Sequence, residues 1–365
     1  MRTRNGGFGW GMAACGLALT LACDDNVTDT GTDLPEDRGS VLQQQVPVEF
    51  FTEIAWSADG NEVYFESPGP PVSLYAASVA GGAPREIDSG RDAYFDITAS
   101  PVGEAVYFAS DLEATSRSSY RLPLGGGDPV ELTNRAPISL AQFRADGKVV
   151  LPSPSGATVV YTVSPDSVFT YGVASGTRTF ITRGCERIVT FSPSGTEVLC
   201  VTAAGGTGTF KTLNLATGAI VDTPVLPATE GIPMAVHWGA SGIRALYQPA
   251  FGGLSFWANG GRTDFFELPN RGGLLLDPRN SSWSHDGERI AFWVHECLRR
   301  RGLNACELGQ SILYIGEVTA DRSDYVAVAQ GEVSGQFIAL SPSATRVAYT
   351  FEDRIYHQST TIPSN

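Results

Sequence analysis

Residues 53–65 read EIAWSADGNEVYF, and residues 281–293 read SSWSHDGERIAFW. In both, an apolar strand-like segment ends in Ser, an Asp-Gly turn follows, and a second apolar segment returns. Asp hydrogen-bonds within such turns and Gly tolerates positive φ, so each stretch predicts a β-hairpin. Five looser copies begin at Phe95, Leu140, Ile188, Ala235 and Phe337. In the last copy we place Thr345 at the Gly position, which predicts a less regular turn.

The copies recur with a period that is typical of β-propellers. Equivalent positions are 41 to 57 residues apart, counted at Trp56, Ile97, Phe143, Phe191, Trp238, Trp283 and Leu340. A repeat of 40–50 residues with four strands corresponds to one propeller blade, which buries both faces only by stacking on its neighbours. The sequence therefore predicts an all-β fold: a single propeller of seven four-stranded blades over residues 40–365, with six or eight blades as alternatives.

The ends of the predicted propeller suggest how the ring closes. The last copy has strand-like segments near 336–342, 346–351 and 353–359, and little chain follows. Residues 40–46 have strand-like length and no partner in the first copy. We expect this segment to supply the fourth strand of the last blade, which removes an open sheet edge. The alternative is that 40–46 continue the preceding spacer.

The repeated Ser-x-Asp-Gly turn between apolar strands resembles the TolB-type repeat family, which is related to WD-repeat propellers. The resemblance covers about 310 residues. It implies a β-propeller. TolB itself has an α/β domain before a six-bladed propeller, and here we expect a short spacer and seven blades. We therefore interpret the chain as TolB-like and not as TolB.

The N-terminus indicates export. Two arginines precede an uncharged apolar stretch, Phe8 to Ala22, which is shorter than the roughly 20 residues that span a bilayer and fits a secretory signal. Ala22-Cys23 resembles the end of a bacterial lipobox, although Thr20 and Leu21 depart from the usual pattern. We expect a signal peptide over 1–22 and a lipid anchor on Cys23, in the periplasm or on the cell surface. An ordinary secretory signal is the alternative.

Residues 23–39 are predicted to form a disordered acidic tether. This segment, CDDNVTDTGTDLPEDRG, has no aromatic residue and few aliphatic ones, so it cannot bury enough surface to offset the entropy of ordering. The whole chain carries a formal net charge of −14. Such a charge repels nucleic acid, which we exclude as a partner.

Four cysteines follow the tether in two close pairs, Cys185 with Cys200 and Cys297 with Cys306. The first pair flanks the hairpin of the fourth copy, and the second brackets a charged segment in the sixth. Export makes oxidation feasible, and neither spacing fits the Cys-x₂₋₄-Cys pairs of zinc sites. We predict two disulfides, 185–200 and 297–306.

No motif predicts a catalytic site, a metal site or a cofactor. The four histidines, His237, His285, His295 and His357, follow no metal-ligand spacing. The sequence has no Gly-x-Ser-x-Gly turn, phosphate-binding loop or EF-hand loop. One local exception to the acidic surface is a basic cluster within the Cys297–Cys306 segment, Arg299, Arg300 and Arg301. We predict a binding loop there for an acidic partner, with a merely solvated loop as the alternative.

Fold does not determine function, so several functions stay open. The leading hypothesis is a non-enzymatic module of the cell envelope that binds a protein or glycan through one rim of the propeller. The alternative is an envelope lyase or hydrolase with its site at the central channel. A third hypothesis is a structural surface lipoprotein without a specific ligand.

Overall fold

The structure is a computed structural model. It describes residues 40–43, 53–67, 71–113, 116–133, 148–163, 166–202, 209–223, 233–247, 254–258, 261–266, 281–300, 306–318, 323–331, 337–351 and 354–360. The chain divides into two compact units, Met1–Asp33 and Leu34–Asn365. The predicted signal peptide 1–22, the lipid anchor Cys23 and the tether 23–39 lie outside the described residues. Within the described ranges, no helix is long and apolar enough to cross a membrane.

The described residues form strands joined into seven four-stranded sheets. Sheet 1 comprises β2 (Ile54–Trp56), β3 (Glu62–Ser67), β4 (Val72–Ser78) and β5 (Arg85–Arg91), and sheet 2 comprises β6 (Phe95–Ala99), β7 (Ala105–Glu113), β8 (Ser116–Pro123) and β9 (Val130–Glu131). Sheet 3 comprises β10 (Val150–Pro152), β11 (Thr158–Val163), β12 (Ser167–Gly172) and β13 (Thr177–Arg183), and sheet 4 comprises β14 (Arg187–Phe191), β15 (Glu197–Thr202), β16 (Thr209–Asn214) and β17 (Ile220–Asp222). Sheet 5 comprises β18 (Pro233–Gly239), β19 (Gly242–Tyr247), β20 (Leu254–Ala258) and β21 (Gly261–Phe266), and sheet 6 comprises β22 (Ser281–Trp283), β23 (Arg289–Arg300), β24 (Cys306–Val318) and β25 (Ser323–Gly331). Sheet 7 comprises β1 (Ser40–Gln43), β26 (Ile338–Leu340), β27 (Arg346–Phe351) and β28 (Arg354–Ser359).

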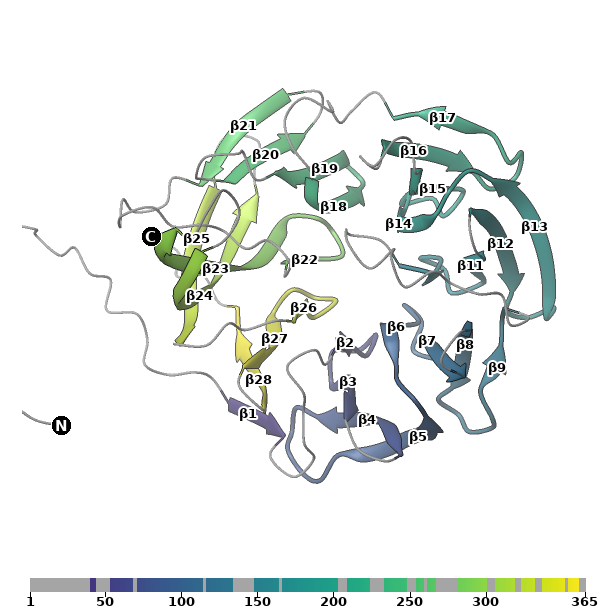
Figure 1. Cartoon of the computed structure of the whole chain (residues 1–365), viewed down its shortest axis with the longest axis horizontal. Coiled ribbons are helices and arrows are strands. Elements are labelled where there is room, and N and C mark those ends of the chain that lie inside the picture. The colour runs from purple at the N-terminus through teal and green to yellow at the C-terminus, as the bar shows by residue number, and fades with distance from the viewer. Residues whose placement is uncertain are drawn as a thin grey trace, which may run out of the picture. The chain divides into compact units, whose positions relative to one another are not determined.

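The fold is a β-propeller with four-stranded blades, as the sequence predicted. In sheets 1 to 6 the strands are antiparallel neighbours in chain order. The first strands of these sheets contact one another in turn, from β2 through β6, β10, β14, β18 and β22 to β26 of sheet 7, and β26 contacts β2. Figure 1 shows the sheets arranged around a ring with these strands innermost.

Sheet 7 is completed by the N-terminal segment. Strand β1 pairs antiparallel with β28, with Ser40 opposite His357 and Val41 opposite Tyr356. The segment predicted to close the last sheet is thus its outer strand over Ser40–Gln43, and residues 44–46 lie outside the described ranges. Figure 1 shows β1 beside β28 at the edge of the ring.

The hydrophobic core lies between neighbouring sheets. Because side chains alternate along a strand, β3 sends Val63 and Phe65 into a cluster with Ala348 and Ile355 of sheet 7. Tyr64, between them, packs in a different cluster with residues of sheet 2. Both faces of the second strand are therefore buried, which explains the continuous apolar run Val63-Tyr64-Phe65 in place of a polar alternation.

A buried serine organises the hairpin that joins the first two strands of a sheet. In sheet 1, Ser57 Oγ donates to Asp59 Oδ1 at 2.6 Å and accepts from the Glu62 N–H at 2.9 Å. The Gly60 N–H donates to the Ser57 carbonyl at 3.0 Å, with φ of 70° at Gly60. The equivalent serines are also buried: Ser100, Ser153, Ser192, Ser284 and Ser341. This explains why six of the seven sheets keep a serine after the first strand; sheet 5 has Gly239 at this position.

Two details of the predicted repeat were wrong. Sheet 3 begins at Val150, and its hairpin turns after Ser153, whereas we had placed its first strand from Leu140. The predicted Asp146-Gly147 turn lies outside the described residues. In sheet 7, Ala344 and not Thr345 holds the Gly position, at φ of 53°. That turn is regular, because the Ala344 N–H donates to the Ser341 carbonyl at 2.8 Å as in the other copies.

Three arginines join sheets 5, 6, 7 and 1, and we call them the arginine junctions. Arg244 at the start of β19 donates to the Gly287 carbonyl of sheet 6. Arg289 of β23 donates to the Ala344 carbonyl of sheet 7 at 3.1 Å. Arg346 of β27 donates to the Gly60 carbonyl of sheet 1 at 3.4 Å. Each guanidinium thus bonds the turn of the next sheet around the ring.

Candidate functional site

A central cavity of about 520 Å³ lies among the inner strands. Its lining includes residues from the first strand of every sheet: Trp56, Thr98, Leu151, Thr190, His237, Trp283 and Leu340. A volume of this size is in the range of small-molecule sites. The propeller arrangement alone produces this convergence, because the seven contributing strands are far apart in sequence.

The lining exposes more apolar than polar surface and is poor in charge. It combines hydroxyl groups with the indoles of Trp56 and Trp283, the imidazoles of His237 and His285, and the ammonium group of Lys148. Among the described residues that line the cavity, none carries a carboxylate. In a chain with net charge −14, the cavity is therefore a local region that does not repel anions or electron-rich ligands.

His237 and His285 both reach this cavity, as members of sheets 5 and 6. The His237 ring stacks on Trp283 with 6.0 Å between ring centroids. Its Nε2 atom is buried and forms no hydrogen bond with the described residues. Burial, then the neighbouring His285 and Arg244, lowers the pKa of His237 to about 4, so the imidazole is neutral at pH 7.

The histidines do not assemble a metal site in the part of the chain that the structure describes. No group of three His, Cys, Asp or Glu side chains there is arranged to hold a metal ion. His357 lies on β28, where it pairs with Ser40 of β1, and His295 lies on β23 opposite Ser311. His237 and His285 are thus brought together, and the other two lie on the second and third strands of their sheets.

A cluster that the sequence analysis missed lies beside the cavity, and we call it the lysine cluster: Glu53, Asp96 and Lys148. Lys148 Nζ donates to the Ile97 carbonyl at 3.0 Å, and the Ile97 N–H donates to Glu53 Oε2 at 3.1 Å. Asp96, at φ of 53°, accepts from the Val149 N–H at 3.2 Å. The cluster therefore joins sheet 1, sheet 2 and the segment that leads into sheet 3.

Burial shifts the titration of the lysine cluster. Burial, and next the charge of Asp96, raises the pKa of Glu53 to about 8, so its carboxyl group keeps its proton at pH 7. Burial lowers the pKa of Lys148, while Glu53 and Asp96 oppose that shift. Strongly shifted groups beside a cavity are candidates for function. One signal was present in the sequence, because the chain has only two lysines, Lys148 and Lys211.

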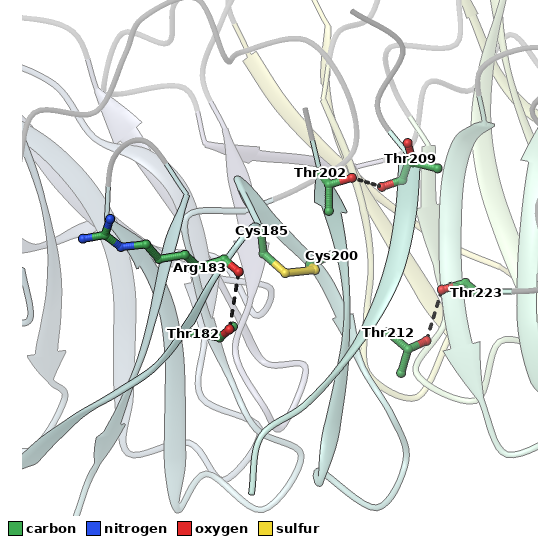
Figure 2. Close-up of a disulfide and its surroundings, with 8 residues drawn as sticks. All are labelled: Thr182, Arg183, Cys185, Cys200, Thr202, Thr209, Thr212 and Thr223. Carbon is green, nitrogen blue, oxygen red and sulfur yellow. Dashed lines mark hydrogen bonds between the residues drawn. A yellow bond between two sulfur atoms is a disulfide. The ribbon is translucent and has the colours of Figure 1, made fainter. Parts of the chain in front are cut away.

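Cys185 and Cys200 form a disulfide, with 5.6 Å between their Cα atoms. This is one of the two pairs that the sequence predicted. Both residues are fully buried in the core between sheets 3 and 4. Figure 2 shows the bond between Cys185, which precedes β14, and Cys200 of β15, near the Thr202–Thr209 and Thr212–Thr223 hydrogen bonds.

The β23–β24 ladder extends to Arg300 and Cys306, with Arg299 opposite Glu307 and Arg300 opposite Cys306. Residues 301–305, which include Arg301, lie outside the described residues. Cys297 lies opposite Leu308, so the two cysteines are offset in register. The predicted 297–306 disulfide stays a prediction, and the arginine cluster lies at the end of a long hairpin.

The comparisons with known proteins give structural neighbours only. No protein-family model matches the chain, and no curated protein matches it. Among solved structures, the chain is similar to TolB from Acinetobacter baumannii, with 15% identity and a TM-score of 0.42. That match covers 77% of this chain and 55% of the Acinetobacter chain. A putative TolB from Agrobacterium tumefaciens has 16% identity and a TM-score of 0.43, with 86% of this chain and 91% of that chain covered.

Proposed function

We propose that this protein is a lipoprotein of the cell envelope whose propeller binds a protein or glycan partner through one rim. The observation that carries the proposal is the extended β23–β24 hairpin, whose strands have 12 and 13 residues. The second and third strands of the other sheets have five to nine. An extension that ends in Arg299 and Arg300, on a chain of net charge −14, suits an acidic partner.

A charge reversal at the hairpin tip tests the partner proposal. We expect the triple variant Arg299→Glu, Arg300→Glu, Arg301→Glu to lose most of the partner that the wild-type protein recovers from envelope extracts. The matched control is Arg354→Glu, because Arg354 is exposed on β28 of the neighbouring sheet. Equal recovery of the same identified partner by the triple variant and the wild type would contradict a role for the hairpin.

Attachment through Cys23 has its own test. The buried Cys185–Cys200 disulfide supports export, because disulfides persist in oxidising compartments. Mass spectrometry of the mature protein should find Cys23 as the first residue, carrying acyl chains. The Cys23→Ala variant should leave the membrane fraction. An unmodified N-terminus at another residue would refute the anchor.

The seven sheets, in our proposal, are seven blades of one closed ring. The support is the cyclic contact of the inner strands and the pairing of β1 with β28. Deleting residues 40–43 should then expose the edge of β28 and lower the midpoint of urea unfolding. A crystal structure with six blades, or with β1 away from β28, would refute this closure.

The central cavity favours a second candidate, an envelope lyase or hydrolase. His237, neutral and with a free Nε2 within the described residues, has the properties of a general base or acid. The variant His237→Gln should then abolish turnover of any envelope substrate without changing recovery of the hairpin partner. Unchanged turnover would exclude this histidine.

A further inference from the structure

Lysine is almost excluded from this chain. Lys and Arg total 25, and only Lys148 and Lys211 are lysines. The two cations differ in chemistry, because a guanidinium keeps its proton in proteins whereas a buried amine can lose it and become a nucleophile. One of the two lysines lines the central cavity. The cavity lining therefore includes Lys148, whose amine can react with a ligand once it has lost its proton.

Lys148 is held firmly at the edge of the cavity. Its backbone exchanges two hydrogen bonds with Ile188 of β14, at 2.7 and 3.0 Å. Its Nζ atom donates to the Ile97 carbonyl at 3.0 Å. Lys211, on β16, instead forms an ion pair with the exposed Asp222. The two lysines of the chain thus occupy contrasting environments, and the reactivity of Lys211 can serve as the reference for that of Lys148.

The surroundings of Lys148 favour its neutral form. Burial penalises the ammonium ion and lowers the pKa of Lys148. The two carboxyl groups that oppose this shift are Glu53 and Asp96, but the raised pKa of Glu53, about 8, leaves Glu53 mostly uncharged at pH 7. An amine beside a protonated carboxyl group, in a cavity of about 520 Å³, is the arrangement that carbonyl condensation requires.

We propose that Lys148 is a reactive amine that forms reversible imines with small aldehydes or ketones bound in the central cavity. The neutral Nζ attacks the carbonyl carbon, a C–N bond forms, and the carbonyl π electrons move to oxygen. Transfer of a proton from nitrogen to oxygen gives the carbinolamine. The hydroxyl group then leaves with a proton as water, and the C=N bond forms.

No oxidant or reductant takes part in this condensation, since amine and carbonyl give imine and water. Glu53 is the proton donor that we assign to this step, because Glu53 and Lys148 both bond backbone groups of Ile97. The hydroxyl groups of Thr98 and Ser281 in the lining supply hydrogen bonds for a polar carbonyl compound. This site is separate from the hairpin tip, so the proposed reaction is an activity distinct from partner binding.

Reductive trapping of the wild-type protein tests the proposal. The folded protein is treated at pH 7 with glyoxylate and sodium cyanoborohydride, which reduces an imine to a stable amine. Peptide mass spectrometry then follows each lysine separately. We expect Lys148 to be modified about tenfold faster than Lys211 or more, with a rate that saturates in glyoxylate. In urea that unfolds the protein, the two rates should become equal.

Two conservative variants complete the test. Lys148→Arg keeps the positive charge and should abolish the saturable modification, whereas Lys211→Arg should leave it unchanged. Neither variant should change recovery of the hairpin partner, so failure here and failure of the proposed function are distinguishable. Modification of Lys148 at the rate of Lys211 or more slowly in the folded protein would overturn the proposal.

Discussion

Sheets 5, 6, 7 and 1 are joined by the arginine junctions, whereas sheets 1, 2 and 3 are joined by the lysine cluster. At the junctions, a guanidinium crosses to the turn of the next sheet and donates to a carbonyl oxygen, as Arg289 does to Ala344. In the cluster, Lys148 and Glu53 bond the backbone carbonyl and the backbone N–H of a single residue, Ile97. Both regions join neighbouring sheets through hydrogen bonds to backbone groups. The arginine junctions use guanidinium groups, whereas the lysine cluster uses an amine and a carboxyl group.

The difference matters because only one region can change its charge near neutral pH. Guanidinium groups stay protonated in proteins, so the arginine junctions are insensitive to pH. The lysine cluster contains a carboxyl group with a pKa of about 8 and an amine with a lowered pKa. The contribution of the cluster to stability therefore depends on pH, and Lys148 lines the cavity, where a titratable group can act on a ligand.

The largest effect should come from breaking the lysine cluster. Lys148→Ala removes the donor to the buried Ile97 carbonyl and the packing of the Lys148 alkyl chain, so we expect a loss of about 3–5 kcal/mol in unfolding free energy. Urea denaturation followed by tryptophan fluorescence measures it. The control, Lys211→Ala, removes an ion pair with exposed Asp222 and should cost about 0.5 kcal/mol. Equal losses would show that the cluster contributes nothing particular.

The next largest effect should come from substituting Gly287, whose carbonyl group accepts from Arg244 in one of the arginine junctions. A Cβ on Gly287 would lie 2.4 Å from Cδ2 of His237, whereas one on Gly60 would meet nothing closer than 3.8 Å. Both have positive φ, 72° and 70°. We expect Gly60→Ala to cost about 1 kcal/mol from backbone strain, and Gly287→Ala about 3 kcal/mol because the clash is added.

A double-mutant cycle isolates that clash. In a His237→Ala background, Gly287→Ala should cost only about 1 kcal/mol, as Gly60→Ala does in the wild type. A cost that stays near 3 kcal/mol in this background would show that the imidazole is not what the new methyl group meets. Thermal unfolding of the four proteins supplies the comparison.

The pH dependence of stability should separate the two regions. Folding raises the pKa of Glu53 from 4.5 to about 8, so this group stabilises the fold fully below pH 4.5 and loses that contribution as the pH rises to 8. Folding lowers the pKa of His237 from 6.5 to about 4, so stability from this group is present above pH 6.5 and is lost as the pH falls to 4. The two slopes oppose each other between pH 4.5 and 6.5.

Above pH 6.5 the contribution of Glu53 is no longer masked by His237. From pH 6.5 to 8 the wild type should lose about 2 kcal/mol relative to Glu53→Gln, which keeps a hydrogen-bond acceptor for Ile97 and cannot ionise. Chemical denaturation of both proteins at several pH values measures the difference. Parallel stability curves would contradict the raised pKa.

The sequence correctly predicted the structural features that depend on local turn chemistry. The Ser-x-Asp-Gly copies located the hairpins of sheets 1 and 6, and the unpartnered segment at 40 located β1. It failed for sheet 3, where Asp146-Gly147 matches the turn pattern better than Ser155-Gly156, which the structure uses. The observed register buries Val149 and Val150 against sheet 2, a long-range contact that no local pattern contains.

The candidate site was harder to predict because its residues are far apart in the sequence and come together only when the sheets pack around the ring. Lys148 is 51 residues from Ile97, and Ile97 is 44 residues from Glu53. Asp96 was part of a copy quoted for its strands, and its positive φ is not encoded by Gly or Asn. His237 and His285 are 48 residues apart in the sequence, and their approach at the cavity depends on how sheets 5 and 6 pack.

The smallest effect on stability should come from breaking an arginine junction. Unlike the effect of the lysine cluster, this loss should not change with pH. Arg289→Ala removes a bond to the Ala344 carbonyl and an ion pair with Glu317, both at the partly exposed edge of the ring. We expect a loss of about 1–2 kcal/mol at pH 6 and the same loss at pH 8, because the guanidinium stays charged throughout. The control Arg354→Ala, at the exposed start of β28, should cost about 0.5 kcal/mol or less. A loss for Arg289→Ala that changes between the two pH values would mean that a titrating group shares the junction, and the contrast with the lysine cluster would then fail.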